Sequence, residues 1–454
     1  MNTAALSLPV VSVQNTFTQV IQEVEDGLSP YDKFWVSCYK NSEPSIHAKV
    51  KAELDHLDRS LVHLKAVEGD VEISRDGTGN YAIACKPLGI LPTQVLTPVQ
   101  EYKDQERSNP TRPHRITSFD ISPDCSRFAT GYLDGSVFLY PTSAALEHPR
   151  KSFSSQEIDI AASRTPSKPH LSGVTSLRFF PSSRVLLTSG IDFSLTILPA
   201  DLPDVPSRNG TRVAPVRTLR AHTRTVTDTA IIDLGRNIVS SSLDSTIKLW
   251  EVSSGEVISS FSTQSAVASM SLGDRLPVPP DGEESMPPPS RDTRETPQTS
   301  SKIVFSGLES GSFELFDLGF KKSVYRSQPA SSSSLSSIAY SQPTNLLATG
   351  SSRGLVTLYD TRNLSTQLTS FSRLETVIED IAFVQNGDNS VGLAIATSDG
   401  LPYVASVLPE GPMVSSELVG ADCDPVRNLK ARLNGNHMEV WSASDDGIVR
   451  RYVL

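Results

Sequence analysis

The chain has 454 residues, 38% of them hydrophobic, with 51 acidic side chains against 41 Lys and Arg and a formal net charge of −10. This length and apolar content suffice for one large domain and a small additional one. The acidic balance argues against nucleic acid as the main partner, because phosphate binding needs a basic surface. No stretch approaches the roughly 20 consecutive apolar residues of a membrane-spanning helix.

The N-terminus, MNTAALSLPVVSV, has no basic segment before its short apolar run, so we predict no signal peptide. The four cysteines, Cys38, Cys85, Cys125 and Cys423, are far apart and have no paired spacing. This pattern favours reduced thiols over a disulfide framework. We therefore expect the protein in the cytoplasm, and a nuclear location is also compatible with this pattern.

Residues 1–91 lack the repeat that fills the rest of the chain. Val50, Leu54, Leu57, Leu61 and Leu64 recur at helical spacing and predict an amphipathic helix. Such a helix usually packs on its own domain and less often on a partner. The segments 34–39 and 81–85 resemble strands. We predict a small N-terminal domain of α/β or β-rich type.

The repeat is clearest in residues 221–252. His222 precedes a strand expected at 226–232, a second strand follows at 237–242, and Asp244 marks a tight turn before a third strand that ends at Trp250. This order is typical of one blade of a WD40 propeller. A single blade cannot bury both of its faces, so one clear copy implies others.

Two independent spacing rules find the weaker copies. The first is a turn residue, usually Asp, six positions before an aromatic residue, because Asp accepts hydrogen bonds in the turn before an alternating strand. It matches Asp134–Tyr140, Asp192–Leu198, Asp244–Trp250 (the best copy), three degraded copies at Ser310–Phe316, Arg353–Tyr359 and Asp399–Ala405, and a last copy at Asp446–Tyr452. The second rule is an apolar residue, two small or polar residues and another apolar residue in each first strand. It matches Ile116–Phe119, Val174–Leu177, Val226–Thr229 (where the second apolar residue, Ala230, comes one place late), Val267–Met270, Leu335–Ile338, Ile378–Ile381 and Val426–Leu429.

The matched pairs predict an all-β fold, a seven-bladed WD40 β-propeller over residues 92–454. The last copy has no outer strand of its own, so we assign a closing strand to residues 92–103, with Thr93–Tyr102 as its donor segment. Residues 273–301 contain many prolines and charges between the first two strands of blade four, which predicts a disordered surface insertion. Residues 141–169 form a second, Ser-rich connection.

Blade three contains a set of residues that resembles a catalytic triad. His222, Ser240, Asp244 and Trp250 include a serine, a histidine and an aspartate. In this repeat family, however, these positions form a buried hydrogen-bond chain that links the loop before the blade to its second and third strands. We therefore predict a structural tetrad and not a catalytic site.

Two other blades carry related sets. Blade one has His114, Thr130, Asp134 and Tyr140. Blade two has His170, Thr188 and Asp192, with Leu198 in place of the aromatic residue. Blades four to six lack most of the set, so we expect them to be locally less stable.

Nothing in the sequence predicts an enzyme. It contains no phosphate-binding Gly-rich loop, no cluster with metal-ligand spacing and no nucleophile elbow. We expect no catalytic residue, no cofactor and no metal, and we expect the chain to be a monomer that binds neither membrane nor nucleic acid.

A protein-binding surface is the remaining possibility, and acidic residues are its candidates. Residues 371–454 contain twelve acidic and six basic residues, a net charge of −6, which suits either a basic partner or simple solubility. Loops on one face of a propeller commonly recognise partners. The acidic residues expected there are Glu309, Glu375, Glu379, Asp422, Asp424 and Asp445.

Blade three is also similar to one particular family. The runs Val226–Asp233, Gly235–Asn237, Ser242–Asp244 and Thr246–Glu251, together with Leu177–Pro181 in blade two, resemble the proteasomal ATPase-associated factor family. The close match covers about fifty residues. The layout of an N-terminal domain followed by seven blades, the fourth of them elaborated, resembles that family over the whole chain.

The resemblance implies a non-enzymatic chaperone for assembly of the base of the 26S proteasome regulatory particle. Members of that family bind the C-terminal domain of a proteasomal ATPase subunit, and an acidic face would suit a basic domain. An alternative remains open, because Tyr359-Asp-Thr-Arg362 resembles the W-D-x-R box of substrate receptors of cullin-RING ubiquitin ligases. A hydrolase propeller is a distant third hypothesis.

Overall fold

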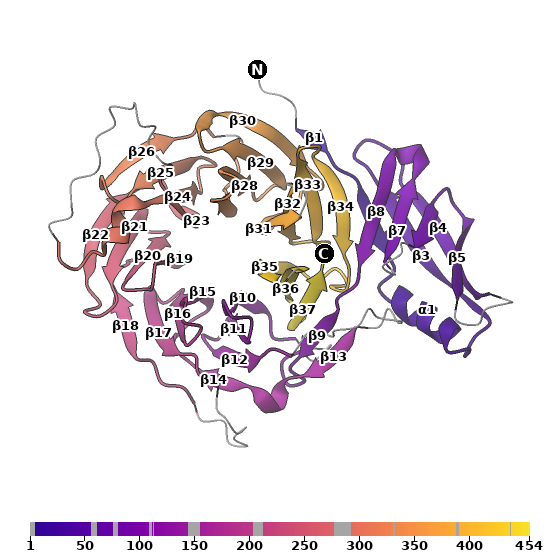
Figure 1. Ribbon diagram of the computed structural model, residues 1–454, viewed down its shortest axis with the longest axis horizontal. Coiled ribbons are helices and arrows are strands. Elements are labelled where there is room, and N and C mark those ends of the chain that lie inside the picture. The colour runs from indigo at the N-terminus through magenta and orange to yellow at the C-terminus, as the bar shows by residue number, and fades with distance from the viewer. Residues whose placement is uncertain are drawn as a thin grey trace.

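The computed structural model describes residues 5–55, 61–75, 80–108, 111, 113–143, 155–202, 212–276, 292–329, 332–386, 390–435 and 437–454. Four-stranded antiparallel sheets follow one another around a ring, and a smaller domain lies against the outside of that ring (Figure 1). The predicted all-β propeller is confirmed. Among the described residues, no helix combines the length and the apolar character needed to cross a bilayer.

The first three sheets contain β10 to β12 and β14 to β22. Blade one has β10 (Ile116–Ile121), β11 (Arg127–Tyr132), β12 (Val137–Pro141) and β14 (Thr165–Ser167). Blade two has β15 (Val174–Phe179), β16 (Val185–Gly190), β17 (Ser194–Pro199) and β18 (Arg217–Arg220). Blade three has β19 (Val226–Ile232), β20 (Asn237–Ser242), β21 (Thr246–Glu251) and β22 (Val257–Ser262).

The remaining sheets of the ring contain β9 and β23 to β37. Blade four has β23 (Val267–Asp274), β24 (Lys302–Leu308), β25 (Phe313–Asp317) and β26 (Lys322–Arg326), and blade five has β27 (Ser337–Ser341), β28 (Leu346–Gly350), β29 (Leu355–Asp360) and β30 (Asn363–Ser372). Blade six has β31 (Ile378–Asn386), β32 (Ser390–Thr397), β33 (Tyr403–Leu408) and β34 (Met413–Leu418). Blade seven has β35 (Val426–Asn434), β36 (His437–Ser444), β37 (Ile448–Val453) and β9 (Gln100–Lys103).

The innermost strand of each sheet contacts the innermost strand of the next, and β35 of blade seven returns to β10 of blade one. The apolar cores lie between neighbouring sheets: Val239 and Leu249 of blade three, for example, pack with Val304 and Phe316 of blade four. Each blade therefore buries both faces only because it has neighbours on both sides.

The ring is closed by β9, which pairs antiparallel with β37. The closing strand is shorter than the predicted 92–103, because residues 90–96 form a different strand, β8 (Ile90–Leu96). Strand β8 pairs in parallel with β34 at the outer edge of blade six. Pro98, which lacks a backbone N–H, lies between these two strands, where a ladder bond cannot continue.

Two further strands extend the outer edges of blades. Strand β1 (Leu6–Ser7) pairs in parallel with β30, so the first described residues belong to blade five and not to the N-terminal domain. Strand β13 (Gln156–Asp159), within the Ser-rich connection, pairs in parallel with β9. A short helical turn, η2 (Ala161–Ser163), then leads from β13 into β14.

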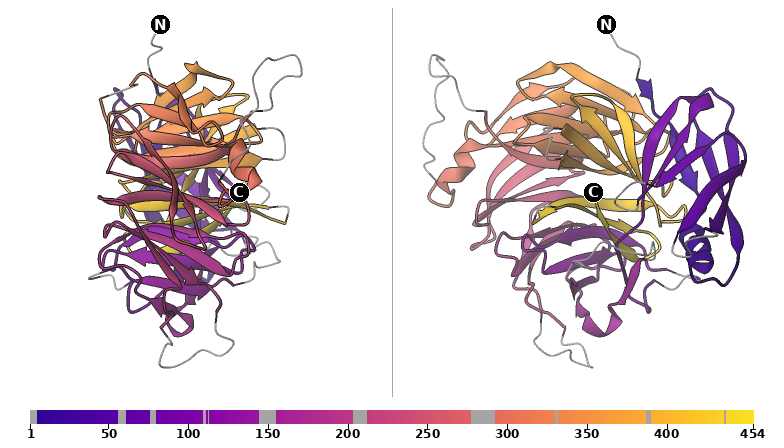
Figure 2. Two further views of the ribbon diagram at one scale, coloured as in Figure 1. Left: turned by 90° about the vertical axis from the view of Figure 1, so that its left-hand side faces the viewer. Right: turned by 45° about the vertical axis from the view of Figure 1, so that its right-hand side comes forward.

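The small domain is β-rich and packs on the rim of the ring beside blade six (Figure 2). Its first sheet contains β2 (Val10–Val13), β3 (Tyr31–Tyr39), β4 (Ile46–Leu54) and β5 (Val62–Glu68). Its second contains β6 (Glu72–Arg75), β7 (Tyr81–Cys85) and β8, with the turn η1 (Lys86–Leu88) between the last two. The helix α1 (Phe17–Glu25) covers this core with Phe17, Val20, Ile21 and Val24.

The helix predicted around residues 50–64 is wrong. Val50 and Leu54 lie in β4 and Leu64 lies in β5, while Leu57 is outside the described residues. In β4 the buried residues alternate with exposed or half-buried ones, which is the two-residue period of a strand. The strands expected at 34–39 and 81–85 correspond to β3 and β7.

The insertion predicted to be disordered at 273–301 is partly ordered. Gly273 and Asp274 belong to β23, residues 277–291 lie outside the described residues, and residues 292–301 end in the turn η3 (Pro297–Ser301). Asn237 of β20 holds this last segment: its Nδ2 donates to Arg294 O at 3.0 Å, and its Oδ1 accepts from Thr296 N at 2.8 Å.

Replacing Asn237 with alanine should therefore destabilise the protein. The side chain is fully buried and also bonds Trp250 O and Thr299 Oγ1, so the change leaves several buried groups without partners. We expect a loss of about 1–3 kcal/mol in the free energy of unfolding, measured with urea. Hydrogen exchange at residues 292–299 should rise as well. Exposed Asn363→Ala is the control, and equal effects of the two changes would contradict the assignment.

Candidate functional site

The blade-three tetrad forms one continuous hydrogen-bond chain. His222, in the loop after β18, contacts Asp244 Oδ2 through Nδ1 and Ser240 Oγ through Nε2, each at 2.8 Å. Trp250 Nε1 donates to the same Ser240 Oγ at 2.8 Å. Asp244, in the turn between β20 and β21, also accepts from Thr223 N and from Thr246. The chain ties the loop to both strands of the blade.

The tetrad has the connectivity of a catalytic triad, but its serine is not accessible as a catalytic serine must be. Ser240 and Trp250 are fully buried. The side chain of His222 has no exposed area. Ser240 Oγ accepts from Trp250 Nε1 and is also hydrogen-bonded to His222 Nε2, and no described cavity reaches the hydroxyl. This arrangement stabilises the blade and cannot accept a substrate.

Burial sets the protonation state of this chain. It lowers the pKa of His222 below the ordinary 6.5, although Asp244 opposes the shift. Burial pushes the pKa of Asp244 upward, but hydrogen bonds from Thr246, Thr223 N and His222 outweigh it and hold that pKa below its ordinary value. A neutral imidazole beside a carboxylate is the state that the folded protein prefers.

The stability of the protein should therefore fall on acidification below pH 6.5. In that range the unfolded chain binds a proton at His222 more readily than the folded chain, so protons favour unfolding. The contribution of Asp244 acts in the same direction and is lost at lower pH, as the pH falls through its folded pKa. Melting temperatures of wild type and His222→Gln should converge as the pH falls from 7 toward 5. Parallel curves would contradict this assignment.

Blade two carries a shorter version of the chain. His170 contacts Asp192 Oδ1 at 3.0 Å and Thr188 Oγ1 at 2.8 Å. Leu171 N donates to Asp192 Oδ2. Leu198 offers no donor to Thr188, whose hydroxyl donates instead to Thr196 O. The loop is therefore tied to the turn, and the chain reaches the third strand through the backbone of Thr196 in β17 and not through an aromatic side chain.

The set predicted in blade one does not form a tetrad. His114 is exposed and lies beside the ring of Tyr132, while Asp134 accepts only from Ser136 within its own turn. Tyr140 donates to the buried Asp104 at 2.8 Å, and Thr130 Oγ1 lies 3.3 Å from Tyr132 Oη.

His114 does not join a tetrad because other side chains occupy the corresponding position in blade one. Asp104, which follows the closing strand, also accepts from Arg164, while Arg107 lies over the rings of Tyr132 and Phe138 at 4.4 and 4.0 Å. The loop before blade one arrives from the closing strand and fills the position that His114 would take. No spacing rule in the sequence points to Asp104.

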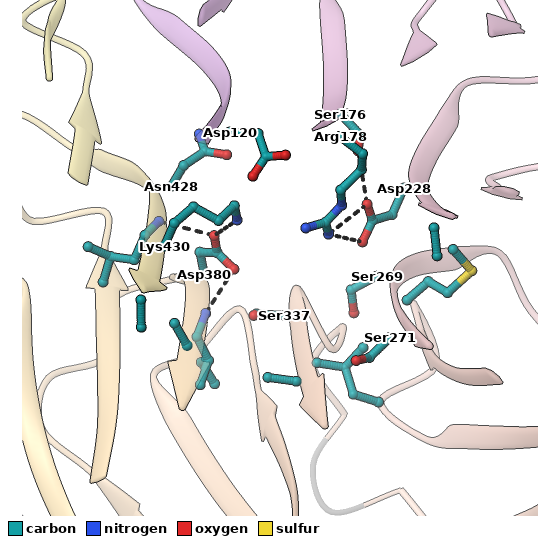
Figure 3. Close-up of a pocket in the computed structure, with 18 of the residues that line it drawn as sticks. Asp120, Ser176, Arg178, Asp228, Ser269, Ser271, Ser337, Asp380, Asn428 and Lys430 are labelled. Carbon is teal, nitrogen blue, oxygen red and sulfur yellow. Dashed lines mark hydrogen bonds and ion pairs between the residues drawn. The ribbon is translucent and has the colours of Figure 1, made fainter. Parts of the chain in front are cut away.

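The innermost strands enclose a central channel of about 1030 Å³ (Figure 3). Ion pairs cross from one blade to the next along its wall: Arg178 to Asp228 at 3.3 Å and Lys430 to Asp380 at 2.9 Å. The proximity of Asp228 raises the pKa of Arg178. Small polar residues continue the pattern, since Thr117 Oγ1 donates to Val174 O and Thr175 Oγ1 to Val226 O. These charges hold neighbouring blades together.

The turns between second and third strands lie on the same face as the loops that enter each first strand, because the strands of each blade alternate in direction. We call this face the turn face. Glu309, Glu375 and Asp422 are exposed there, and Asp424 is half-buried. Burial, together with Asp446 and Asp445, raises the pKa of Asp424.

Two of the six predicted acidic residues are not free to contact a partner. Glu379 lies in β31 on the channel wall, and Asp445 is buried in its turn. Both bind Arg427, at 2.6 and 2.9 Å. Burial raises the pKa of Glu379 although Arg427 opposes it. The charge pattern alone did not reveal this pairing, because Arg427 comes from the first strand of blade seven.

The pairing of cations leaves a distinct set of acidic residues uncompensated in blades six and seven. All six cations of residues 371–454 bind carboxylates: Arg373 with Glu417, Arg427 with Glu379 and Asp445, Lys430 with Asp380, Arg432 with Asp120, Arg450 with Glu101 and Asp446, and Arg451 with Glu439. Glu375, Asp422 and Asp424 form no ion pair with a described residue. The turn face is therefore negative over these blades.

Arg362, the residue of the ligase-receptor alternative, follows β29 on the opposite face. It is exposed, and its guanidinium donates through Nε and Nη2 to the Asp360 carboxylate at 2.9 and 2.6 Å. That contact lowers the pKa of Asp360.

Among the described residues, no group of three His, Cys, Asp or Glu side chains is arranged to hold a metal ion.

A buried ion pair that the sequence analysis missed joins the N-terminal domain to the ring. Arg373 donates to both carboxylate oxygens of Glu417 at 2.6 and 2.7 Å, and lies over the ring of Tyr403. Val11 N of β2 donates to Glu417 Oε1 at 2.9 Å. No sequence signal links residues so far apart.

Three segments of the chain match the family described as "WD domain, G-beta repeat": residues 107–140, 164–197 and 213–251. They end at the third strands of blades one, two and three. The chain is thus a WD40 propeller, a fold that generally serves as a non-enzymatic scaffold for protein–protein interaction.

Proposed function

We propose that this protein is a non-enzymatic chaperone for assembly of the base of the 26S proteasome regulatory particle. In this proposal it acts in the cytoplasm, also in the nucleus, as a monomer that binds the C-terminal domain of a proteasomal ATPase subunit through the turn face. The resemblance of blades two and three to the proteasomal ATPase-associated factor family supports the choice of partner.

The observation that carries the proposal is the uncompensated acidic surface of the turn face. Glu309, Glu375, Asp422 and Asp424 are held on short turns and loops of a rigid ring. Carboxylates displayed in this way attract a basic partner and determine its orientation more than they add raw affinity. Every cation of blades six and seven forms an internal pair, so the negative charge there remains available to such a partner. Arg353, exposed in the turn of blade five beside Leu374, forms no ion pair with a described carboxylate.

Charge reversal on the turn face tests the proposal. We expect Glu375→Lys combined with Asp422→Lys to weaken binding of the full chain to the recombinant C-terminal domain of its ATPase partner about tenfold or more, chiefly through slower association. Biolayer interferometry against each of the ATPase C-terminal domains would measure this and identify the subunit. The melting temperature should fall only slightly, since both side chains are exposed and the positive φ of Asp422 (33°) is the one source of strain for the new lysines.

The matched control is Glu410→Lys. Glu410 is exposed in the connection from β33 to β34, on the opposite face of the same blade. It should leave affinity unchanged. If the chain bound none of the ATPase domains, the proposed function would be wrong. If Glu410→Lys weakened binding as much as the turn-face variant, the binding site would not be the turn face. Binding to a cullin adaptor that is lost in Arg362→Ala would instead favour the ligase-receptor alternative.

A further inference from the structure

Four large apolar side chains are exposed together on the turn face of blades one and two. Leu133 (57% exposed) follows β11, Leu171 (86%) lies in the loop before β15, and Ile191 (40%) and Phe193 (43%) lie in the turn between β16 and β17. Contiguous apolar surface of this kind is uncommon on a soluble protein and often marks a binding site. We call these four residues the Phe193 surface.

The side chains of this surface are close neighbours in the structure. The loop before β15 runs between the two turns: a Cβ built on Gly173 would lie 3.0 Å from Ile191 Cδ1 and 3.4 Å from Leu133 Cδ2. Leu171 N donates to Asp192 Oδ2, which fixes Leu171 beside the turn that carries Ile191 and Phe193. The surface therefore rests on hydrogen-bonded backbone and is formed before any partner binds.

Phe193 has an unfavourable backbone conformation as well as an exposed ring. It has φ of 66°, in the left-handed region that a bulky residue rarely adopts. The corresponding turn position has positive φ in every blade, and it is occupied by Gly135, Ser245, Gly311, Gly354, Gly400 and Gly447 in the others. Glycine would fit blade two equally well, so an exposed phenylalanine at this point is not explained by folding.

The border of the surface is basic. Lys168, Arg220 and Arg224 are exposed and form no ion pair with any described carboxylate. Arg220 is the cross-strand partner of Ser194, the residue after Phe193, and Lys168 lies near enough to Asp134 to lower its pKa, an effect secondary to the Ser136 hydrogen bonds. The Asp192 carboxylate is occupied by His170, Leu171 N and Ser194. The charge that faces solvent is therefore mainly positive, with Asp134, next to Leu133, as an exposed carboxylate.

We propose that the Phe193 surface binds an acidic amphipathic peptide segment of a second partner protein. Phe193 and Leu171 would anchor apolar side chains of that segment, while Lys168 and Arg220 would pair with its carboxylates. This site lies on blades one and two, away from the acidic surface of blades four to seven, and prefers the opposite charge. It goes beyond the proposed function, and either can fail without the other.

The test is a selection of random peptides displayed on phage, made on the full chain and counter-selected on Phe193→Gly. We expect enriched peptides that combine Leu, Ile, Phe or Trp with Asp and Glu. Fluorescence anisotropy with the enriched peptide should show about tenfold or greater weakening in Phe193→Gly and in Leu171→Ser. Lys168→Glu combined with Arg220→Glu should also weaken binding, and more so at low salt.

Stability separates binding from folding in this test. Because glycine is at ease at positive φ, the melting temperature of Phe193→Gly should be no lower than that of wild type. Leu234→Ser is the control, since Leu234 is 82% exposed on the opposite face, in the turn between β19 and β20. Three results would overturn the proposal: peptides that bind Phe193→Gly as well as wild type, enrichment of basic peptides, or a lower melting temperature in Phe193→Gly.

Discussion

Replacing Trp250 with alanine should lower the free energy of unfolding by about 3–5 kcal/mol, one of the two largest effects that we expect from one substitution in the ring. The side chain is fully buried and packs with Leu187, Leu195 and Ile238 between blades two and three. Its removal leaves a large cavity and deprives Ser240 Oγ of a donor. Urea denaturation followed by circular dichroism would measure the change.

Trp35→Ala is the matched control for Trp250. Trp35 lies on the solvent side of β3, 46% exposed, and its ring contacts Lys49 Nζ at 4.7 Å from the centroid. An exposed cation–π contact contributes about 0.5–1 kcal/mol, so the control should lose far less stability than the buried tryptophan. If both substitutions destabilised the protein equally, the tetrad would not be the structural centre of blade three.

Replacing Glu417 with alanine should cost about 3–5 kcal/mol, because it leaves the Arg373 guanidinium buried without a counter-charge. Both side chains of the pair are only 4% exposed. The same change removes the acceptor of Val11 N, which joins β2 of the N-terminal domain to blade six. We therefore expect faster proteolysis of the N-terminal domain as well as lower overall stability, measured by limited trypsin digestion and urea denaturation.

The exposed pair of Arg184 and Asp201 is the control for this substitution. Its side chains are 71% and 52% exposed, so Asp201→Ala should leave stability and proteolysis unchanged. A Glu417→Ala protein that unfolds and resists trypsin as wild type does would show that the N-terminal domain is held by its apolar contacts alone.

The blades could be predicted from the sequence because their signals are local. The alternation of a strand and the carboxylate of a tight turn lie within a few residues of each other, and Asp244 and Trp250 keep that spacing without interruption. Blade seven was also predictable up to its closing strand. The start of that strand was not predictable, since β8 and β9 follow each other closely along the chain and are distinguished by the sheet edge that each one meets.

The candidate site was less predictable because its contacts are not local. His114 has the right spacing for a tetrad, yet Asp104 and Arg107 arrive from the closing strand and occupy its place. Glu379 and Asp445 have the right charge for a partner surface, yet Arg427 neutralises both. Helix α1 could have been found, since Phe17, Val20, Ile21 and Val24 keep a helical period. The sequence analysis placed its helix at residues 50–64 instead, because the apolar residues there also recur at helical spacing.

The most direct test of the proposed chaperone role is affinity purification of the tagged full chain from its source cells, followed by mass spectrometry. The proposal predicts recovery of regulatory-particle ATPases together with other assembly chaperones, and without the mature core particle. Recovery of a cullin and its adaptor in place of any ATPase would contradict the chaperone role. It would favour a ligase receptor that binds its adaptor through Arg362.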